Sequence, residues 1–344
     1  VSLSGDLGFK MDGTDIIAVG SSVTAALTAG DAVHVSLSNA DFGLMAGTGS
    51  TAFELKNGSF SAAIDGLGSI TAQTVLVRYT DATTSVASGT TITVGSTSYT
   101  FNDAIESDTV ALEVTGFEAN VADFVSLSGD IGFKKTGTDI IAVGSSVTAA
   151  LTAGSSAHVS LSNADFGLMA GTGSTAFELK NGSFSAAIDG LGSITAQTVL
   201  VRYTDATTSV ASGTTITVGS TSYTFNDAIE SDTVALEVTG FEANVADFVS
   251  LSGDIGFKKT GTDIIAVGSS VTAALTAGDT AHVSLSNADF GLMAGTGSTA
   301  FELKNGSFSA GIEGLGSITA RTVLVRYTDA STSVNAGTTL TVGF

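Results

Sequence analysis

Acidic side chains gather in the segment 102–123, which reads NDAIESDTVALEVTGFEANVAD. Calcium prefers about six to eight oxygen ligands, and three of these carboxylates are close enough in the chain to supply some of them. The calcium-binding nonapeptide G-G-x-G-x-D and the EF-hand loop are both absent. We therefore interpret the segment as a solvated acidic face that opposes aggregation of strands, with calcium left open as a ligand and no metal-binding residue assigned. The candidate calcium ligands are Asp103, Glu106 and Asp108, and the other acidic residues are Glu113, Glu118 and Asp123.

Histidine is the other side chain that could bind a metal or transfer a proton, and the chain has only His34, His158 and His282. We interpret each as a surface residue of a strand, too far from the other two to share a metal. The motifs of serine hydrolases, zinc proteases, P-loop proteins and dinucleotide-binding proteins are missing, and there is no cysteine. A catalytic centre needs a single concave site, which would rarely be copied along a chain. The sequence therefore predicts that the protein is not an enzyme.

Two further patterns could carry sugar or bind a partner. The stretch TDATTSVASGTT at 80–91 is the richest in serine and threonine, and we interpret it as an ordinary long turn rather than an O-glycosylated or binding loop. Asn57, Asn181 and Asn305 each open an N-G-S sequon, which matters only in a host that glycosylates asparagine.

These residues recur because the sequence is a repeat. Val1, Val125 and Val249 open near-identical copies spaced 124 residues apart. We divide the chain into a first repeat at 1–124, a second at 125–248 and an incomplete third at 249–344. The start at Val1 and the stop inside a repeat lead us to expect part of a longer chain.

The elements that hold these residues are predicted to be strands. Apolar residues alternate with polar ones, and valine, isoleucine, threonine and phenylalanine abound. We predict an all-β, β-solenoid-like elongated repeat array in which each segment is a rung with a Gly or Asn corner. The alternative is tandem antiparallel β-sandwich domains, in which the segments are hairpin-linked strands and the Gly or Asn is a bulge. The segments 10–15 and 93–101 predict hairpins, which favours the sandwich alternative. The segment 118–130 predicts a strand that continues across the repeat boundary, which favours the solenoid, and 101–114 comes nearest to a helical pattern.

Charge limits the partners. The formal net charge of -21 opposes binding to nucleic acid or to an anionic membrane surface. No apolar run approaches the roughly 20 residues of a membrane-spanning helix, so no membrane-spanning segment is expected.

The run GFKKTGTDIIAVG, followed by ALTAG and VSLSNADFGLMAG, resembles the repeat regions of giant secreted or surface proteins of Gram-negative bacteria, which are adhesin-like and highly repetitive. This resemblance implies an extracellular or cell-surface location and a stiff β-rich stalk, filament or surface fibre. The partners would be the chain itself or neighbouring repeats of a longer chain. The alternative is an adhesive module that recognises carbohydrate or another cell through repeated loops, with cell-surface glycans as partners.

Overall fold

The computed structural model describes residues 1–342 except 31, 123, 247 and 279. Its described residues form strands and turns and no helix. The strands of the first repeat are β1 (Ser2–Asp12), β2 (Asp15–Ala29), β3 (Val33–Gly47), β4 (Ser50–Ile64), β5 (Gly68–Thr80), β6 (Thr91–Val94), β7 (Thr97–Thr100) and β8 (Thr109–Val121). Those of the second are β9 (Val125–Thr136), β10 (Asp139–Ala153), β11 (Ala157–Gly171), β12 (Ser174–Ile188), β13 (Gly192–Thr204), β14 (Thr214–Val218), β15 (Thr221–Phe225) and β16 (Thr233–Val245). Those of the third are β17 (Val249–Thr260), β18 (Asp263–Ala277), β19 (Ala281–Gly295), β20 (Ser298–Ile312) and β21 (Gly316–Thr328).

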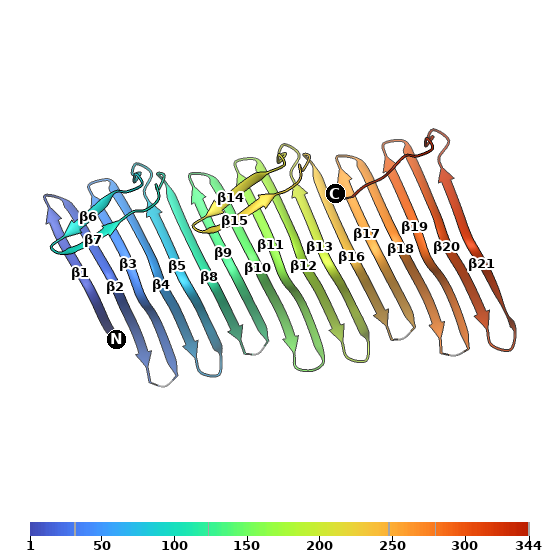
Figure 1. The fold of residues 1–344 in the computed structure, drawn as a ribbon, viewed down its shortest axis with the longest axis horizontal. Coiled ribbons are helices and arrows are strands. Elements are labelled where there is room, and N and C mark those ends of the chain that lie inside the picture. Colours follow the sequence, from blue (N-terminus) through green and yellow to red (C-terminus); the bar gives the residue numbers. More distant parts are fainter. Residues whose placement is uncertain (31, 123, 247, 279, 343–344) are drawn as a thin grey trace. The chain divides into compact units, whose positions relative to one another are not determined.

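The chain packs as two compact units. The first consists of Val1–Ala149, Asp165–Gly173 and Thr215–Thr224, and the second of Ala150–Ala164, Ser174–Thr214 and Phe225–Phe344. In the first unit β1, β2, β3, β4, β5, β8 and β9 pair antiparallel in that order. In the second unit β12, β13, β16, β17, β18, β19, β20 and β21 do the same. Each unit is therefore an antiparallel meander, seen as neighbouring strands joined by short turns in Figure 1.

This arrangement confirms the predicted all-β repeat array. One feature differs from the expected rungs. Each long segment crosses the sheet as one antiparallel strand instead of bending at a corner. The turns between strands are short and use glycine where the backbone is left-handed, as at Gly13 with a φ of 65° and Gly49 with a φ of 74°. The hairpin predicted at 10–15 joins β1 to β2, and the one predicted at 93–101 is β6–β7.

A row of bulges crosses the long strands near their middle. Ser22, Asn39 and Asn57 have positive φ values of 52°, 58° and 65°, and the pairing register shifts beside Ser22 and beside Asn57. Asp41 holds two of these bulges, because its Oδ1 accepts a 2.9 Å hydrogen bond from the Ser22 amide and its Oδ2 a 2.7 Å bond from the Asn57 side chain. Asparagine tolerates the left-handed conformation better than most residues. The Asn expected at a corner or bulge is thus a bulge within a continuous strand.

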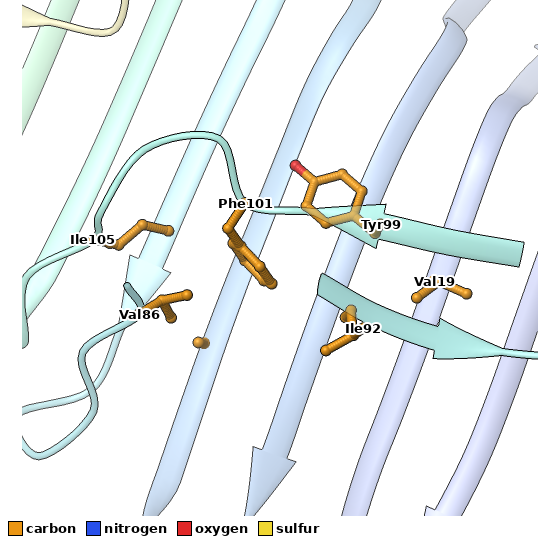
Figure 2. Packing of buried hydrophobic residues seen from close by; sticks show 7 residues of the cluster. Val19, Val86, Ile92, Tyr99, Phe101 and Ile105 are labelled. Atoms are coloured by element: carbon orange, nitrogen blue, oxygen red, sulfur yellow. The ribbon is translucent and has the colours of Figure 1, made fainter. Parts of the chain in front are cut away.

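A hairpin covers one face of the sheet in the first repeat. β6–β7 leaves the meander after β5 and lies across β1, β2 and β3, where Figure 1 shows it in cyan. Alternate residues of the hairpin face the sheet, so Ile92, Tyr99 and Phe101 are buried with exposed fractions of 6%, 3% and 0%. With the sheet and loop residues beneath them they form a core cluster, most of which Figure 2 labels: Val19, Ala52, Val86, Ile92, Tyr99, Phe101 and Ile105. Each buried valine, isoleucine or phenylalanine among them contributes about 1.5–3 kcal/mol by leaving water.

The prediction that 118–130 forms one continuous strand is wrong. β8 ends at Val121 and β9 starts at Val125. Between them Ala122 has a φ of 49°, and the amide of Phe124 donates a 2.9 Å hydrogen bond to the Val121 carbonyl, which closes a turn. The turn was missed because it contains neither glycine nor proline. The nearly helical pattern at 101–114 belongs to a loop followed by the first half of β8.

Candidate functional site

The most unusual chemistry in the structure is a charged and largely buried cluster under the hairpin, with one exposed carboxylate at its edge. We call Glu54, Lys56, Arg78, Tyr99 and Asp103 the anchor cluster. Glu54 is fully buried on β4, and its Oε2 accepts a 2.5 Å hydrogen bond from Nε of Arg78 on the neighbouring strand β5. Its Oε1 accepts a 2.7 Å bond from the hydroxyl of Tyr99 on β7. Both carboxylate oxygens are thus occupied, one by the sheet and one by the hairpin.

Other members of the anchor cluster also hold the hairpin and its following loop on the sheet. Arg78 also donates a 2.6 Å bond to Asp103, which lies in the loop that follows β7. Nζ of Lys56 lies 4.5 Å from the centre of the Tyr99 ring and donates a 2.7 Å bond to the carbonyl of Thr100. Burial, and then the hydrogen bond to Glu54, raise the pKa of Tyr99. The phenol therefore stays protonated and remains a donor to the carboxylate.

Glycine forms the floor on which the hairpins lie. A Cβ at Gly43 would meet the Tyr99 ring at 2.4 Å, and a Cβ at Gly8 would meet Val94 at 2.7 Å. The same contact recurs for the second-repeat hairpin β14–β15, because a Cβ at Gly132 would meet Val218 at 2.7 Å. Real Cβ atoms do not approach so closely, so these glycines let the hairpin backbone sit close to the sheet.

A second carboxylate connects the first repeat to the second. Glu113 on β8 is 5% exposed, and its Oε1 accepts hydrogen bonds from the amides and hydroxyls of Ser220 and Thr221 in the β14–β15 turn, at 2.7–2.8 Å. Gly219 has a φ of 60°, and a Cβ there would lie 1.8 Å from the Glu113 carboxylate, so the turn favours glycine. We call this contact the inter-repeat joint. It couples residues more than a hundred positions apart.

The third repeat has the same sheet residues, and among the described residues, which stop at Val342, no second hairpin strand lies above them. A groove of about 1000 Å³ lies there, within the second unit. Its walls include Phe301, Glu302, Lys304 and Arg326, the counterparts of anchor-cluster strand residues and their neighbour. Glu237, the counterpart of Glu113, also lines it.

The acidic residues singled out from the sequence do not come together as a metal site. Asp103 bonds to Arg78, Glu106 accepts a 3.1 Å bond from Lys134, and Asp108 lies 3.8 Å from Nζ of Lys135. Glu113 belongs to the inter-repeat joint, Glu118 is exposed on β8, and Asp123 lies outside the described residues. Across the part of the chain that the structure describes, no group of three or more His, Cys, Asp or Glu side chains could hold a metal ion.

The remaining candidates lie in exposed or structural positions. His34, His158 and His282 are exposed on strands, as predicted, and the rings of His158 and His282 contact Ser185 and Ser309 at 3.1 and 3.0 Å. The stretch at 80–91 is a loop, as predicted, and its Val86 is tied to Ile105 by two backbone hydrogen bonds. At the sequons, the Asn305 side chain donates to Asp289 as Asn57 does to Asp41.

Sequence patterns did not single out the strand residues that hold the hairpin on the sheet by hydrogen bonds. Glu54 sits in the run FELK and Arg78 in LVRY, so each places a charge among apolar neighbours of a strand. Opposite charges in adjacent strands were the available signal, because a charge on a buried face needs a partner. No local sequence pattern could indicate the inter-repeat joint, because Glu113 and Thr221 are far apart in the chain.

No family model, curated protein or solved structure matches the chain. The likeness to adhesin-like repeat regions therefore stays a prediction. In the described residues there is also no helix with the length and apolar character that crossing a bilayer requires.

Proposed function

We propose that the chain is a structural repeat protein at a bacterial cell surface, a segment of a stiff β-rich stalk, filament or surface fibre. The observation that carries this proposal is the inter-repeat joint, in which Glu113 of the first repeat holds the hairpin turn of the second repeat through Ser220 and Thr221. A protein that only displayed independent modules would have no need of such a contact. An array with a mechanical role would benefit from such a contact, because it resists bending between the two repeats that it connects.

Two further features support a mechanical role. The polar groups of the anchor cluster are satisfied by the chain itself, so the cluster serves to fix the hairpin on the sheet. The sequence repeats with almost no variation between its copies, which suits an array whose useful property is its length.

The test is to change the number of repeats and measure length. A chain carrying one more copy of 125–248 adds six sheet strands, β9–β13 and β16. At about 4.8 Å per strand we expect the maximum dimension in small-angle X-ray scattering to grow by about 29 Å, with an unchanged cross-section. Growth in cross-section with little gain in length would contradict the proposal.

A further inference from the structure

The sheet of the first unit carries its hairpins on one face only. Val19 and Ala52 point toward the β6–β7 hairpin, because both are buried in the core cluster beneath it. Successive side chains of a strand point to opposite faces, so the next residues along, Ala18 and Phe53, lie on the other side of the sheet. We call this other side the apolar face. Residues paired across neighbouring strands share a face, so the pairing register assigns the remaining strands.

Large apolar side chains occupy the apolar face and are exposed there. On β8, Val110 and Leu112 are 44% and 46% exposed on this face, whereas Ala111 and Glu113 are buried on the hairpin side. Other exposed members lie near both ends of the strands: Phe9, Tyr79, Phe133, Leu27, Ile70 and Val121. The face is therefore a half-exposed apolar layer with no second layer over it.

The bulges keep both halves of the long strands apolar on this face. Val19 and Val23 would share a face in a regular strand, yet Val19 lies under the hairpin and Val23 on the apolar face. A Cβ at Gly20, which is on the apolar face, would meet the Val23 side chain at 2.8 Å and the Phe42 ring at 2.2 Å. The bulge at Ser22 makes this switch. The apolar pattern thus runs the whole length of the strand on one side.

Charged side chains lie away from the apolar face. Among the described residues of β1–β5, β8 and β9, the register places only one charged side chain on it, that of Lys135, at the end of β9 and 3.8 Å from Asp108. The carboxylates of Glu54 and Glu113 point to the hairpin side. The net charge of -21 would oppose association of two copies through a surface that carried it. Contact through the apolar face brings no carboxylates of these strands together.

The apolar face is larger than a soluble monomer usually leaves in water. Its seven strands are each 11 residues or longer. At about 4.8 Å between strands and about 3.3 Å per residue they cover roughly 1,200 Å². The largest apolar patch of a typical monomer covers about 300–600 Å². A stable protein interface takes about 800 Å² from each partner, so this face alone could supply one.

We propose that two copies of this chain pack their apolar faces against each other as the two layers of a β-sandwich. An uncharged apolar surface is complementary to a second copy of itself, as a two-fold pairing requires. The two sheets would lie about 10 Å apart, with their strands within about 30° of each other. An anionic lipid surface fits less well, because Lys135 is the only cation that the described strands of this unit place on the face.

This pairing goes beyond the mechanical role and does not rest on it. A chain whose length failed to grow with repeat number would still present the apolar face. A stalk that grew as expected could still be a single chain. The length measurement and the association measurement therefore fail independently.

The experiment is sedimentation velocity of the full chain from nanomolar to micromolar concentration. We expect a dimer of twice the 34.1 kDa chain mass at micromolar concentration, which dissociates on dilution. Added salt should keep or strengthen the dimer, because it screens the repulsion between two acidic chains. A chain that stays monomeric at every concentration would overturn the proposal, and so would a dimer that salt dissociates.

A matched pair of variants on β8 locates the contact. Leu112→Glu places a carboxylate on the apolar face, and we expect the dissociation constant of the dimer to rise about a hundredfold. Asn120→Glu adds the same charge on the hairpin side of the same strand, where Asn120 is exposed, and should change it less than about threefold. Equal effects of the two variants would contradict the pairing of apolar faces.

Two controls keep the result interpretable. Far-UV circular dichroism shows whether Leu112→Glu keeps its strands, and Phe9→Glu replaces it if it does not, because Phe9 is 65% exposed on the edge strand β1. Flotation with neutral phosphatidylcholine vesicles tests lipid as the alternative occupant. A monomeric chain that floats with these vesicles, and loses this binding on Leu112→Glu, would assign the apolar face to lipid and overturn the proposal.

Discussion

The first and third repeats present the same ion pair in two environments. Glu54 and Arg78 lie under a hairpin, and Glu302 and Arg326 lie in an open groove, yet the Nε to Oε2 distances are 2.5 and 2.6 Å. The sheet alone therefore sets the geometry of the pair. The hairpin and the loop after it bury the pair and add the bonds with Tyr99 and Asp103. Burial decides what the pair contributes to stability, because water screens an exposed pair and a buried charge depends on its partner.

The largest expected effect is the loss of a buried partner. Glu54→Ala leaves Arg78 and Tyr99 without their acceptor, and we expect the free energy of unfolding of the first hairpin to fall by about 3–5 kcal/mol. Glu302→Ala, the matched control, should change stability little. The measurement is amide exchange by NMR, of 91–101 for Glu54→Ala and of β20–β21 for Glu302→Ala. Segmental isotope labelling is needed because 81–124 and 205–248 are identical in sequence. Similar losses in the two variants would refute the role of burial.

A smaller loss should follow when only the hairpin's bond to the cluster is removed. Tyr99→Phe keeps the ring on Gly43 and deletes the hydroxyl that donates to Glu54. We expect the hairpin to lose about 1.5–3 kcal/mol, since the acceptor is charged and buried. The same NMR exchange experiment measures it, with Tyr79→Phe as the control because Tyr79 is 42% exposed. Protection of the hairpin that is unchanged by Tyr99→Phe would show that the bond contributes nothing.

The sequence predicted the parts of this structure that depend on local patterns. Alternation predicted the strands and glycine in the turns predicted the hairpins, because each of these preferences acts within a few residues. The Asn residues marked an irregularity, but the preferred prediction was a corner and the structure has a bulge. The sequence did not predict which charged residues of different strands pair in the folded chain. Asp103 and Glu106 were considered as calcium ligands, but their cations Arg78 and Lys134 arrive from other strands.

Glu113 and its counterpart Glu237 should respond differently to the same substitution. Glu113→Gln weakens the bonds to Ser220 and Thr221, so we expect a fall of about 1–2 kcal/mol in stability. Glu237→Gln removes a charge whose pKa burial raises and whose Oε2 has no partner, so we expect unchanged or slightly higher stability. Thermal unfolding by circular dichroism measures both. A larger loss from Glu237→Gln than from Glu113→Gln would contradict the assignment of the joint.

The smallest difference between repeats should appear at the loop that follows β5, β13 and β21. Hydrogen bonds lower the pKa of Asp81, Asp205 and Asp329 to about 2, chiefly from the Thr83 amide, the Thr207 amide and the Thr332 hydroxyl respectively. An acid whose pKa is lower in the folded state stabilises the fold above its unfolded value of about 3.9 and loses this contribution as pH falls toward 2.

This loss should be the same whether or not a hairpin covers the sheet, because the donors come from the loop itself and from the start of the adjacent long strand. We therefore expect Asp81→Asn and Asp329→Asn to flatten the fall of stability between about pH 4 and pH 2 to equal extents. Urea unfolding at a series of pH values measures the slope for each variant. A clearly smaller effect of Asp329→Asn would mean that the hairpin helps to hold the aspartate. In that case the open groove would differ from the covered sheet in its loop as well as in its burial.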